Sequence, residues 1–147
     1  HDTSVSYVKP HGGLYHDMMN NENVFKAILS AISSYDKNIK LMILSSPKNE
    51  EYALIAKAYN ISLWYEVFAD RNYNDDGSLV SRSQSNAVID DEQLVIKRIK
   101  DLKEKGTLNS ISGKELSLAT DVLCVHGDTK NALEFMKSLE RKSLNDI

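Results

Sequence analysis

A strand–helix–strand pattern lies in residues 41–67, which read LMILSSPKNEEYALIAKAYNISLWYEV. The stretch begins and ends with short apolar runs, residues 41–44 and 63–67, and neither run alternates cleanly between apolar and polar residues. Strands that are buried on both faces have this composition, as in parallel sheets. Between the runs, Tyr52 and Ile55 belong to an apolar series at helical spacing. The stretch therefore predicts a βαβ unit with a right-handed crossover.

The same alternation continues on both sides of this unit. Further apolar runs lie at residues 5–8 and 122–125. Helical patterns follow pairs of cap-like residues: Asn20 and Asn21, Asp90 and Asp91, and Asp128 and Thr129. A small hairpin is predicted in residues 107–118, where Ser112 and Gly113 give a turn signal. We therefore predict an α/β fold of parallel β/α units in a single domain, residues 1–147. Four core strands are few for an α/β enzyme, so we expect this domain to be part of a larger one.

The composition is that of an ordinary globular chain. Of 147 residues, 41% are hydrophobic and 27% are charged, and the net charge is -3 from 18 basic and 21 acidic residues. This charge gives no reason to expect nucleic acid or an anionic membrane as a partner. No apolar run approaches the roughly 18 residues that span a bilayer, and no signal peptide is visible. The single cysteine, Cys124, favours a reducing compartment, so we expect a cytoplasmic protein.

Titratable side chains gather where the predicted strands end. In chain order they are Lys9 and His11, then Glu66, Asp70 and Arg71, then His126 and Asp128. In parallel α/β folds, ligands bind at the carboxyl ends of the strands, which meet at one edge of the sheet. We therefore expect the lysine, the glutamate and both histidines to lie at a common rim.

Several of these residues are candidates for binding an anionic substrate. Lys9 suits a carboxylate or phosphate as a point charge. Arg82 suits a bidentate contact with a carboxylate, and the alternative is a solvated arginine. Asp70 and Arg71 are candidates for substrate binding, or they pair with each other and shape the loop. Asp128 is a further candidate, with helix capping as the alternative.

Three residues are candidates for proton transfer. Glu66 lies inside an apolar run, where a carboxylate needs a partner, so it suits a general base. A structural ion pair of Glu66 with Arg71 or Arg82 is the alternative. His11 suits an acid/base or a metal ligand, unless it only bonds the backbone of its turn. His126 suits a ligand contact because its charge is adjustable near neutral pH.

Common metal and nucleotide motifs are missing from the sequence. It contains no His-x-x-x-His or Cys-x-x-Cys spacing, and no Walker-type loop or G-x-G-x-x-G. We therefore predict no metal site and no nucleotide cradle within the chain. Cys124 lies in an apolar run and is expected to be an inert core residue.

Five motifs are specific when they occur together and in order. They are VKPHGGLY at residues 8–15, EVFADR at 66–71, DGSLV at 76–80, RSQ at 82–84 and CVHGDT at 124–129. With them the chain resembles the LamB/YcsF family over essentially its whole length. The resemblance implies an irregular β/α barrel akin to the glycoside hydrolase/deacetylase superfamily. Family members carry an additional N-terminal portion with further strands and site residues, so the chain is expected to match the C-terminal part of that barrel.

The resemblance also implies an activity, which is the ATP-dependent opening of 5-oxoproline to L-glutamate by a 5-oxoprolinase. The chain would act as the A subunit, an amidohydrolase on a cyclic amide, and the segment alone is expected to be inactive. The B and C subunits would be its partners and would activate the lactam with ATP; a homo-oligomer is left open. Taken with this activity, the candidate catalytic residues are Glu66, His11 and His126, and the candidate substrate-binding residues are Lys9, Arg82, Asp70, Arg71 and Asp128.

Two alternatives to this activity remain open from the sequence. One is a metal-dependent hydrolase of the carbohydrate deacetylase type, with the other metal ligands supplied by the N-terminal portion. The other is a non-catalytic assembly protein that presents its polar strand ends to a partner. Metal analysis of the intact protein and lactamase activity without this chain would separate them.

Overall fold

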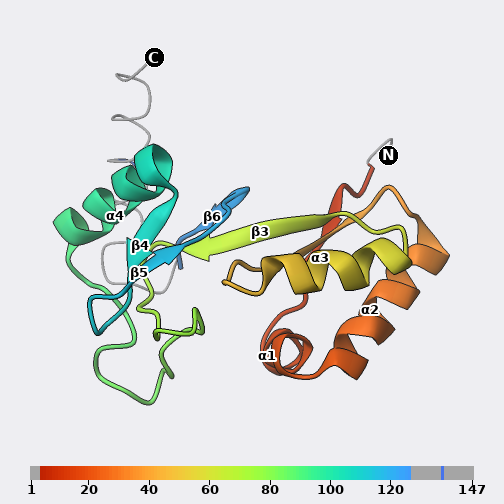
Figure 1. Ribbon diagram of the computed structural model, residues 1–147, viewed down its shortest axis with the longest axis horizontal. Coiled ribbons are helices and arrows are strands. Elements are labelled where there is room, and N and C mark those ends of the chain that lie inside the picture. The colour runs from red at the N-terminus through yellow and green to blue at the C-terminus, as the bar shows by residue number, and fades with distance from the viewer. Residues whose placement is uncertain (1–3, 127–136, 138–147) are drawn as a thin grey trace. The chain divides into compact units, whose positions relative to one another are not determined.

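The computed structural model describes residues 4–126 and residue 137 (Figure 1). Contacts divide the chain into two compact units. Unit 1 comprises His1–Val67 and Ala119–Val122, and unit 2 comprises Phe68–Leu118 and Leu123–Ile147. The prediction of a single domain stays a prediction. None of the helices in the described part of the chain has the length and apolar composition that a membrane crossing requires.

Three strands carry the functional side chains of unit 1. They are β1 (Tyr7–Val8), β2 (Lys40–Leu44) and β3 (Leu63–Phe68), and β1–β2 and β2–β3 both pair in parallel. In this register Leu44 lies opposite Glu66. The four residues of β2 after Lys40 are all buried, as predicted from an apolar run without alternation.

Three helices pack with these strands (Figure 1). They are α1 (Gly13–Asn20), α2 (Glu22–Tyr35) and α3 (Asn49–Ala58). The Asn21 side chain caps α2 by accepting a hydrogen bond from the Asn23 N–H at 3.0 Å, so the predicted capping is confirmed. The helices and strands share one core of buried side chains: Met18, Phe25, Leu29, Ile32, Ile39, Leu41, Ile43, Ala56 and Ile61.

In unit 2, the helix α4 (Glu92–Lys105) has both ends defined by its sequence. The Asp91 carboxylate accepts hydrogen bonds from the N–H groups of the next helical turn, the nearer at 2.9 Å. Gly106 ends the helix in the left-handed region at φ 68°, a conformation that glycine adopts at little cost. The strand β6 (Val122–Cys124) begins at the last residue of unit 1 and continues into unit 2, and the strand order of the main sheet is β1-β2-β3-β6.

The predicted hairpin is confirmed in unit 2. Its strands β4 (Thr107–Asn109) and β5 (Glu115–Ser117) pair antiparallel. One carboxylate outside the hairpin binds its turn, because Asp75 Oδ1 accepts hydrogen bonds from Ser110 Oγ at 2.6 Å and from Ser112 Oγ at 2.5 Å. The Asp75 side chain therefore ties the hairpin to the preceding loop.

This contact predicts a pH-dependent hairpin. The two hydroxyl hydrogen bonds hold the pKa of the Asp75 carboxyl below its usual 3.8. A carboxyl with a depressed pKa stabilises the fold above its unfolded pKa and loses that contribution as the pH falls through the folded pKa. Amide exchange protection at Ser110, whose N–H donates to the Lys114 carbonyl of the hairpin, should therefore hold near pH 5 and fall below about pH 3.9. In Asp75→Asn the protection should be weaker and flat across this range, and unchanged wild-type protection down to about pH 2 would contradict the assignment.

The structure differs from the sequence-based expectations at the N-terminal end. The first strand is shorter than residues 5–8, and Val5 is 59% exposed. The helix α1 was not predicted, because no side chain caps it and Met18 is its only buried residue. The helix expected after Asp128 lies outside the described residues.

Candidate functional site

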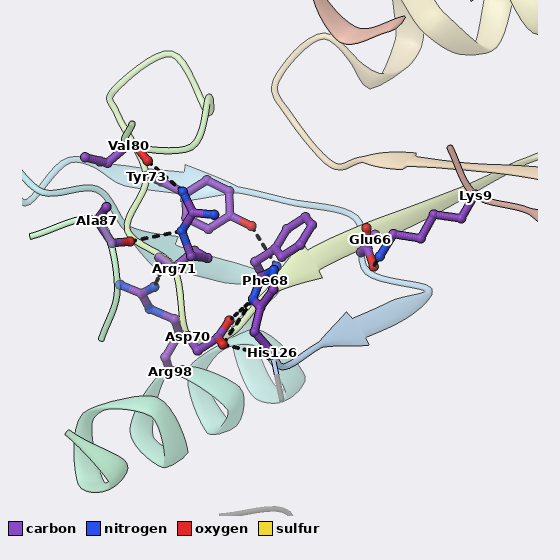
Figure 2. Close-up of polar contacts among 10 residues, drawn as sticks. All are labelled: Lys9, Glu66, Phe68, Asp70, Arg71, Tyr73, Val80, Ala87, Arg98 and His126. Atoms are coloured by element: carbon purple, nitrogen blue, oxygen red, sulfur yellow. Dashed lines mark hydrogen bonds and ion pairs between the residues drawn. The ribbon is translucent and has the colours of Figure 1, made fainter. Parts of the chain in front are cut away.

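The first candidate group surrounds the buried carboxylate of Glu66 in unit 1. Its side chain is only 2% exposed. Lys9, directly after β1, forms an ion pair with Oε1, and Tyr15 of α1 donates a hydrogen bond to Oε2 at 3.2 Å (Figure 2 shows Lys9 and Glu66). The Lys9 ammonium also lies 5.9 Å from the centre of the Tyr15 ring. Each oxygen of the carboxylate therefore has a donor, one of them a cation, as a buried charge requires.

The backbone next to Glu66 is fixed by the neighbouring strand. The Ser45 N–H, just after β2, donates to the Glu66 carbonyl at 2.9 Å. Asn49 at the start of α3 holds this turn from both sides, since its Nδ2 donates to Ser45 Oγ at 3.0 Å and its Oδ1 accepts from the Ser46 N–H at 2.9 Å. The position of Glu66 is therefore set by the β2–α3 connection as well as by β3.

The prediction from the strand ends is confirmed for one pair of residues. Lys9 and Glu66 lie together, and the ion pair of Glu66 is with Lys9, whereas the sequence suggested Arg71 or Arg82. The His11 side chain is exposed, and within residues 4–126 it makes no hydrogen bond or ion pair. That His11 and His126 share a rim with Lys9 and Glu66 stays a prediction.

The second candidate group is an aspartate–histidine pair in unit 2 (Figure 2). The Asp70 side chain is 3% exposed and accepts a hydrogen bond from the His126 backbone N–H at 2.8 Å. His126 Nδ1 lies 3.1 Å from both Asp70 oxygens. The Phe68 ring stacks on the imidazole with 5.3 Å between ring centres. Backbone, ring nitrogen and ring face of His126 are thus all held in place.

This geometry defines what His126 can do chemically. A carboxylate accepts hydrogen bonds, so the contact assigns a proton to Nδ1. In the neutral imidazole, Nε2 then carries the lone pair and can take up a proton. Asp70 stabilises the imidazolium that results, which makes the pair suitable for general acid–base chemistry.

Arg71 follows Asp70 in sequence, but its guanidinium binds backbone carbonyls. Its Nε donates to the Ala87 carbonyl at 3.1 Å, and a terminal nitrogen donates to the Val80 carbonyl at 2.7 Å. Arg71 is buried, at 6% exposure, and these bonds connect it to two distant points of the loop that follows. A substrate-binding role for Arg71 stays a prediction, and its observed contacts are those of a loop-shaping residue.

Sequence reasoning missed four side chains that support the two groups. They are Tyr15, Phe68, Tyr73 and Arg98. For Arg98 a signal exists, because it lies three residues after Val95 and four before Leu102, both buried on the inner face of α4. A charged residue on such a face needs a partner. The aromatic residues carry no comparable signal.

The remaining candidates are less informative. Arg82 is exposed, and Asp128 lies outside the described residues. Cys124 is only partly buried, and its carbonyl accepts a hydrogen bond from the Ala69 N–H at 3.0 Å. The described residues contain no group of three or more His, Cys, Asp or Glu side chains that could hold a metal ion.

Comparison with known proteins places these residues in a family. The model of the LamB/YcsF family matches residues 1–146. The chain belongs to the LamB/YcsF family. Relatives named as the A subunit of 5-oxoprolinase are 40% identical over 142 residues in Vibrio campbellii and 42% identical over 139 residues in Campylobacter jejuni subsp. doylei. These matches cover 97% and 95% of this chain but 55% and 53% of the relatives, so the chain spans about half of their length.

A solved structure agrees with the family assignment. The lactam utilization protein of Thermus thermophilus matches with a TM-score of 0.80 and 26% sequence identity. The match covers 95% of this chain and 56% of that one. It confirms the predicted fold class of parallel β/α units of an irregular β/α barrel.

Proposed function

We propose that this LamB/YcsF chain is part of the A subunit of an ATP-dependent 5-oxoprolinase. In this role it opens 5-oxoproline to L-glutamate together with the B and C subunits. The observation that carries the proposal is the match of at least 95% of the chain, at 40–42% identity, to relatives that carry the name of this 5-oxoprolinase component. The likeness to a lactam utilization protein supports the same substrate class.

The reaction needs two proton transfers. Water oxygen bonds to the lactam carbonyl carbon, the C–N bond breaks, and the released nitrogen takes up a proton to become the amine of glutamate. We assign this protonation to His126: Nε2 first takes up a proton from solvent while Asp70 holds Nδ1, and it then passes that proton to the released nitrogen. Removal of a proton from water is assigned to Glu66, with His11 as the second candidate.

Substrate binding is assigned to the basic side chains. Lys9 is paired with Glu66, and its ammonium is the point charge that we propose for binding a ligand carboxylate or phosphate. Arg82 is exposed and suits bidentate contact with a carboxylate. The other proposed substrate-binding residues are Asp70, Arg71 and Asp128. Asp70 contributes through its hydrogen bonds to His126.

We place ATP on the B and C subunits. The sequence contains no Walker-type loop and no G-x-G-x-x-G loop, so neither of these nucleotide-binding motifs is available in this chain. The proposed division of labour has B and C activate the lactam with ATP, in the cytoplasm, and this chain complete the ring opening.

Reconstitution tests the proposal. The complete gene product that contains this chain is combined with the B and C subunits, ATP and isotope-labelled 5-oxoproline, and labelled glutamate is measured by NMR. Glutamate is expected only when all three proteins are present. Full glutamate release by B and C alone would contradict the proposal and would support a non-catalytic assembly role.

A further inference from the structure

The backbone around Asp70 is held at four consecutive residues of unit 2. The Phe68 N–H donates to the Tyr73 hydroxyl at 2.8 Å, and the Ala69 N–H donates to a backbone carbonyl of β6. The Asp70 carbonyl accepts from a backbone N–H at 2.8 Å. The Arg71 carbonyl accepts from the Arg98 guanidinium. Of these four hydrogen bonds, only the last is made by a charged side chain (Figure 2).

Arg98 reaches this point from the inner face of α4. A second guanidinium nitrogen donates to Asn72 Oδ1 at 3.0 Å, so the fork of the guanidinium binds two successive residues after Asp70. Burial lowers the pKa of Arg98, while the negative charge of Asp70 is among the influences that oppose this shift. The partly buried guanidinium of Arg98 is therefore close enough to the Asp70 carboxylate to interact with its charge.

We propose that Arg98 is a positioning residue for the Asp70–His126 pair. By holding the peptide between Arg71 and Asn72, one residue beyond Asp70, it fixes the course of the backbone from which the Asp70 carboxylate projects. That carboxylate binds His126 at both the backbone N–H and Nδ1, with contacts of 2.8 and 3.1 Å. Rotation of the Arg71 peptide would misalign both contacts, because hydrogen bonds weaken steeply with angle. The expected effect on turnover rests on the proposed function, and the effect on the histidine does not.

The test compares Arg98→Met with Lys97→Met, an exposed residue of the same helix. Both variants are made in the complete gene product and assayed with the B and C subunits. Arg98→Met is expected to lower kcat for glutamate release about 10- to 100-fold with little change in KM, as small misplacements of a catalytic group do. Lys97→Met should keep wild-type kcat.

Nitrogen NMR of ¹⁵N-histidine protein gives the readout that a merely structural role would not change. The signals of His126 are identified by their loss in His126→Gln. In the wild type one ring nitrogen should be protonated and the other not, whereas in Arg98→Met the two signals should move towards each other as the tautomers mix. Arg98→Lys keeps the charge but not the planar fork, so it should shift the same signals by a smaller amount.

Distinct results would overturn the inference. An Arg98→Met protein that melts at a lower temperature but keeps the wild-type histidine spectrum and kcat would show that Arg98 only stabilises the fold. If Arg98→Met does not fold, wild-type spectrum and kcat in Arg98→Lys would overturn the positioning role equally. If the wild-type protein has no 5-oxoprolinase activity but Arg98→Met still shifts the His126 signals, the inference is upheld and the proposed function is contradicted.

Discussion

Replacing His126 with glutamine is expected to lower kcat for glutamate release from 5-oxoproline by about 10²- to 10⁴-fold, the usual contribution of a positioned acid or base. The physical reason is the loss of Nε2, which takes up a proton and passes it to the departing lactam nitrogen. Glutamine cannot transfer a proton, but it can keep a polar contact with Asp70. KM should change little, because the lost interaction develops in the transition state. Initial rates at varied 5-oxoproline, with the B and C subunits present, give both constants.

Asp70→Asn should act through the same group. An amide at this position no longer stabilises the imidazolium and permits the wrong tautomer, so kcat should fall by a comparable factor. In the double variant Asp70→Asn/His126→Gln, the two losses of kcat should be far from additive, because both residues serve one proton transfer. His16→Gln, an exposed histidine of α1, is the matched control and should keep wild-type kcat. Wild-type turnover in His126→Gln would contradict the assigned role.

Lys9→Met is expected to destabilise the protein by about 3 to 5 kcal/mol, the range measured when one partner of a buried ion pair is removed. The Glu66 side chain is 2% exposed and, among the residues that the structure describes, would keep only the Tyr15 hydroxyl as a donor in place of a cation. Methionine matches the apolar stem of lysine, so lost packing contributes little. Urea unfolding of the complete protein, followed by fluorescence, measures the free energy of unfolding.

A second substitution separates charge burial from catalysis at Glu66. Adding Glu66→Gln to Lys9→Met removes the unpaired charge, so the double variant should regain part of the lost stability. The double variant should nevertheless lack glutamate release, because Glu66 is the proposed base that takes a proton from water. Lys57→Met, on the exposed side of α3, is the control for the loss of a lysine. A Lys9→Met protein as stable as the wild type would show that Glu66 does not depend on this cation.

The regular elements that the sequence predicted are those with strong local signals. The runs at residues 41–44 and 63–67 became β2 and β3, because strands buried on both faces need apolar side chains at every position. The caps at Asn21 and Asp91 fixed the starts of α2 and α4. The helix α1 has no such cap, and it forms because Met18 packs into the core, which is a tertiary effect.

The candidate groups could be predicted only in part. The strand ends identified Lys9 and Glu66 as neighbours, but their ion pair depends on the parallel register of three strands, which a sequence does not specify. Asp70 and His126 were both candidates, and their hydrogen bonds join residues 56 positions apart. Arg98 contacts a backbone carbonyl 27 residues away. Every residue has such a carbonyl, so the sequence does not indicate which one Arg98 binds.

The ratio of ADP to glutamate, measured in the same reaction, tests most directly whether this chain completes the ring opening after the ATP-dependent step. The B and C subunits are assayed with the complete gene product, either wild type or His126→Gln. We expect ATP hydrolysis to continue in the variant while glutamate release falls, so that the ADP formed per glutamate rises at least about tenfold, a small part of the loss expected for an acid–base residue. An unchanged ratio, with unchanged glutamate release or with both products falling together, would contradict the account.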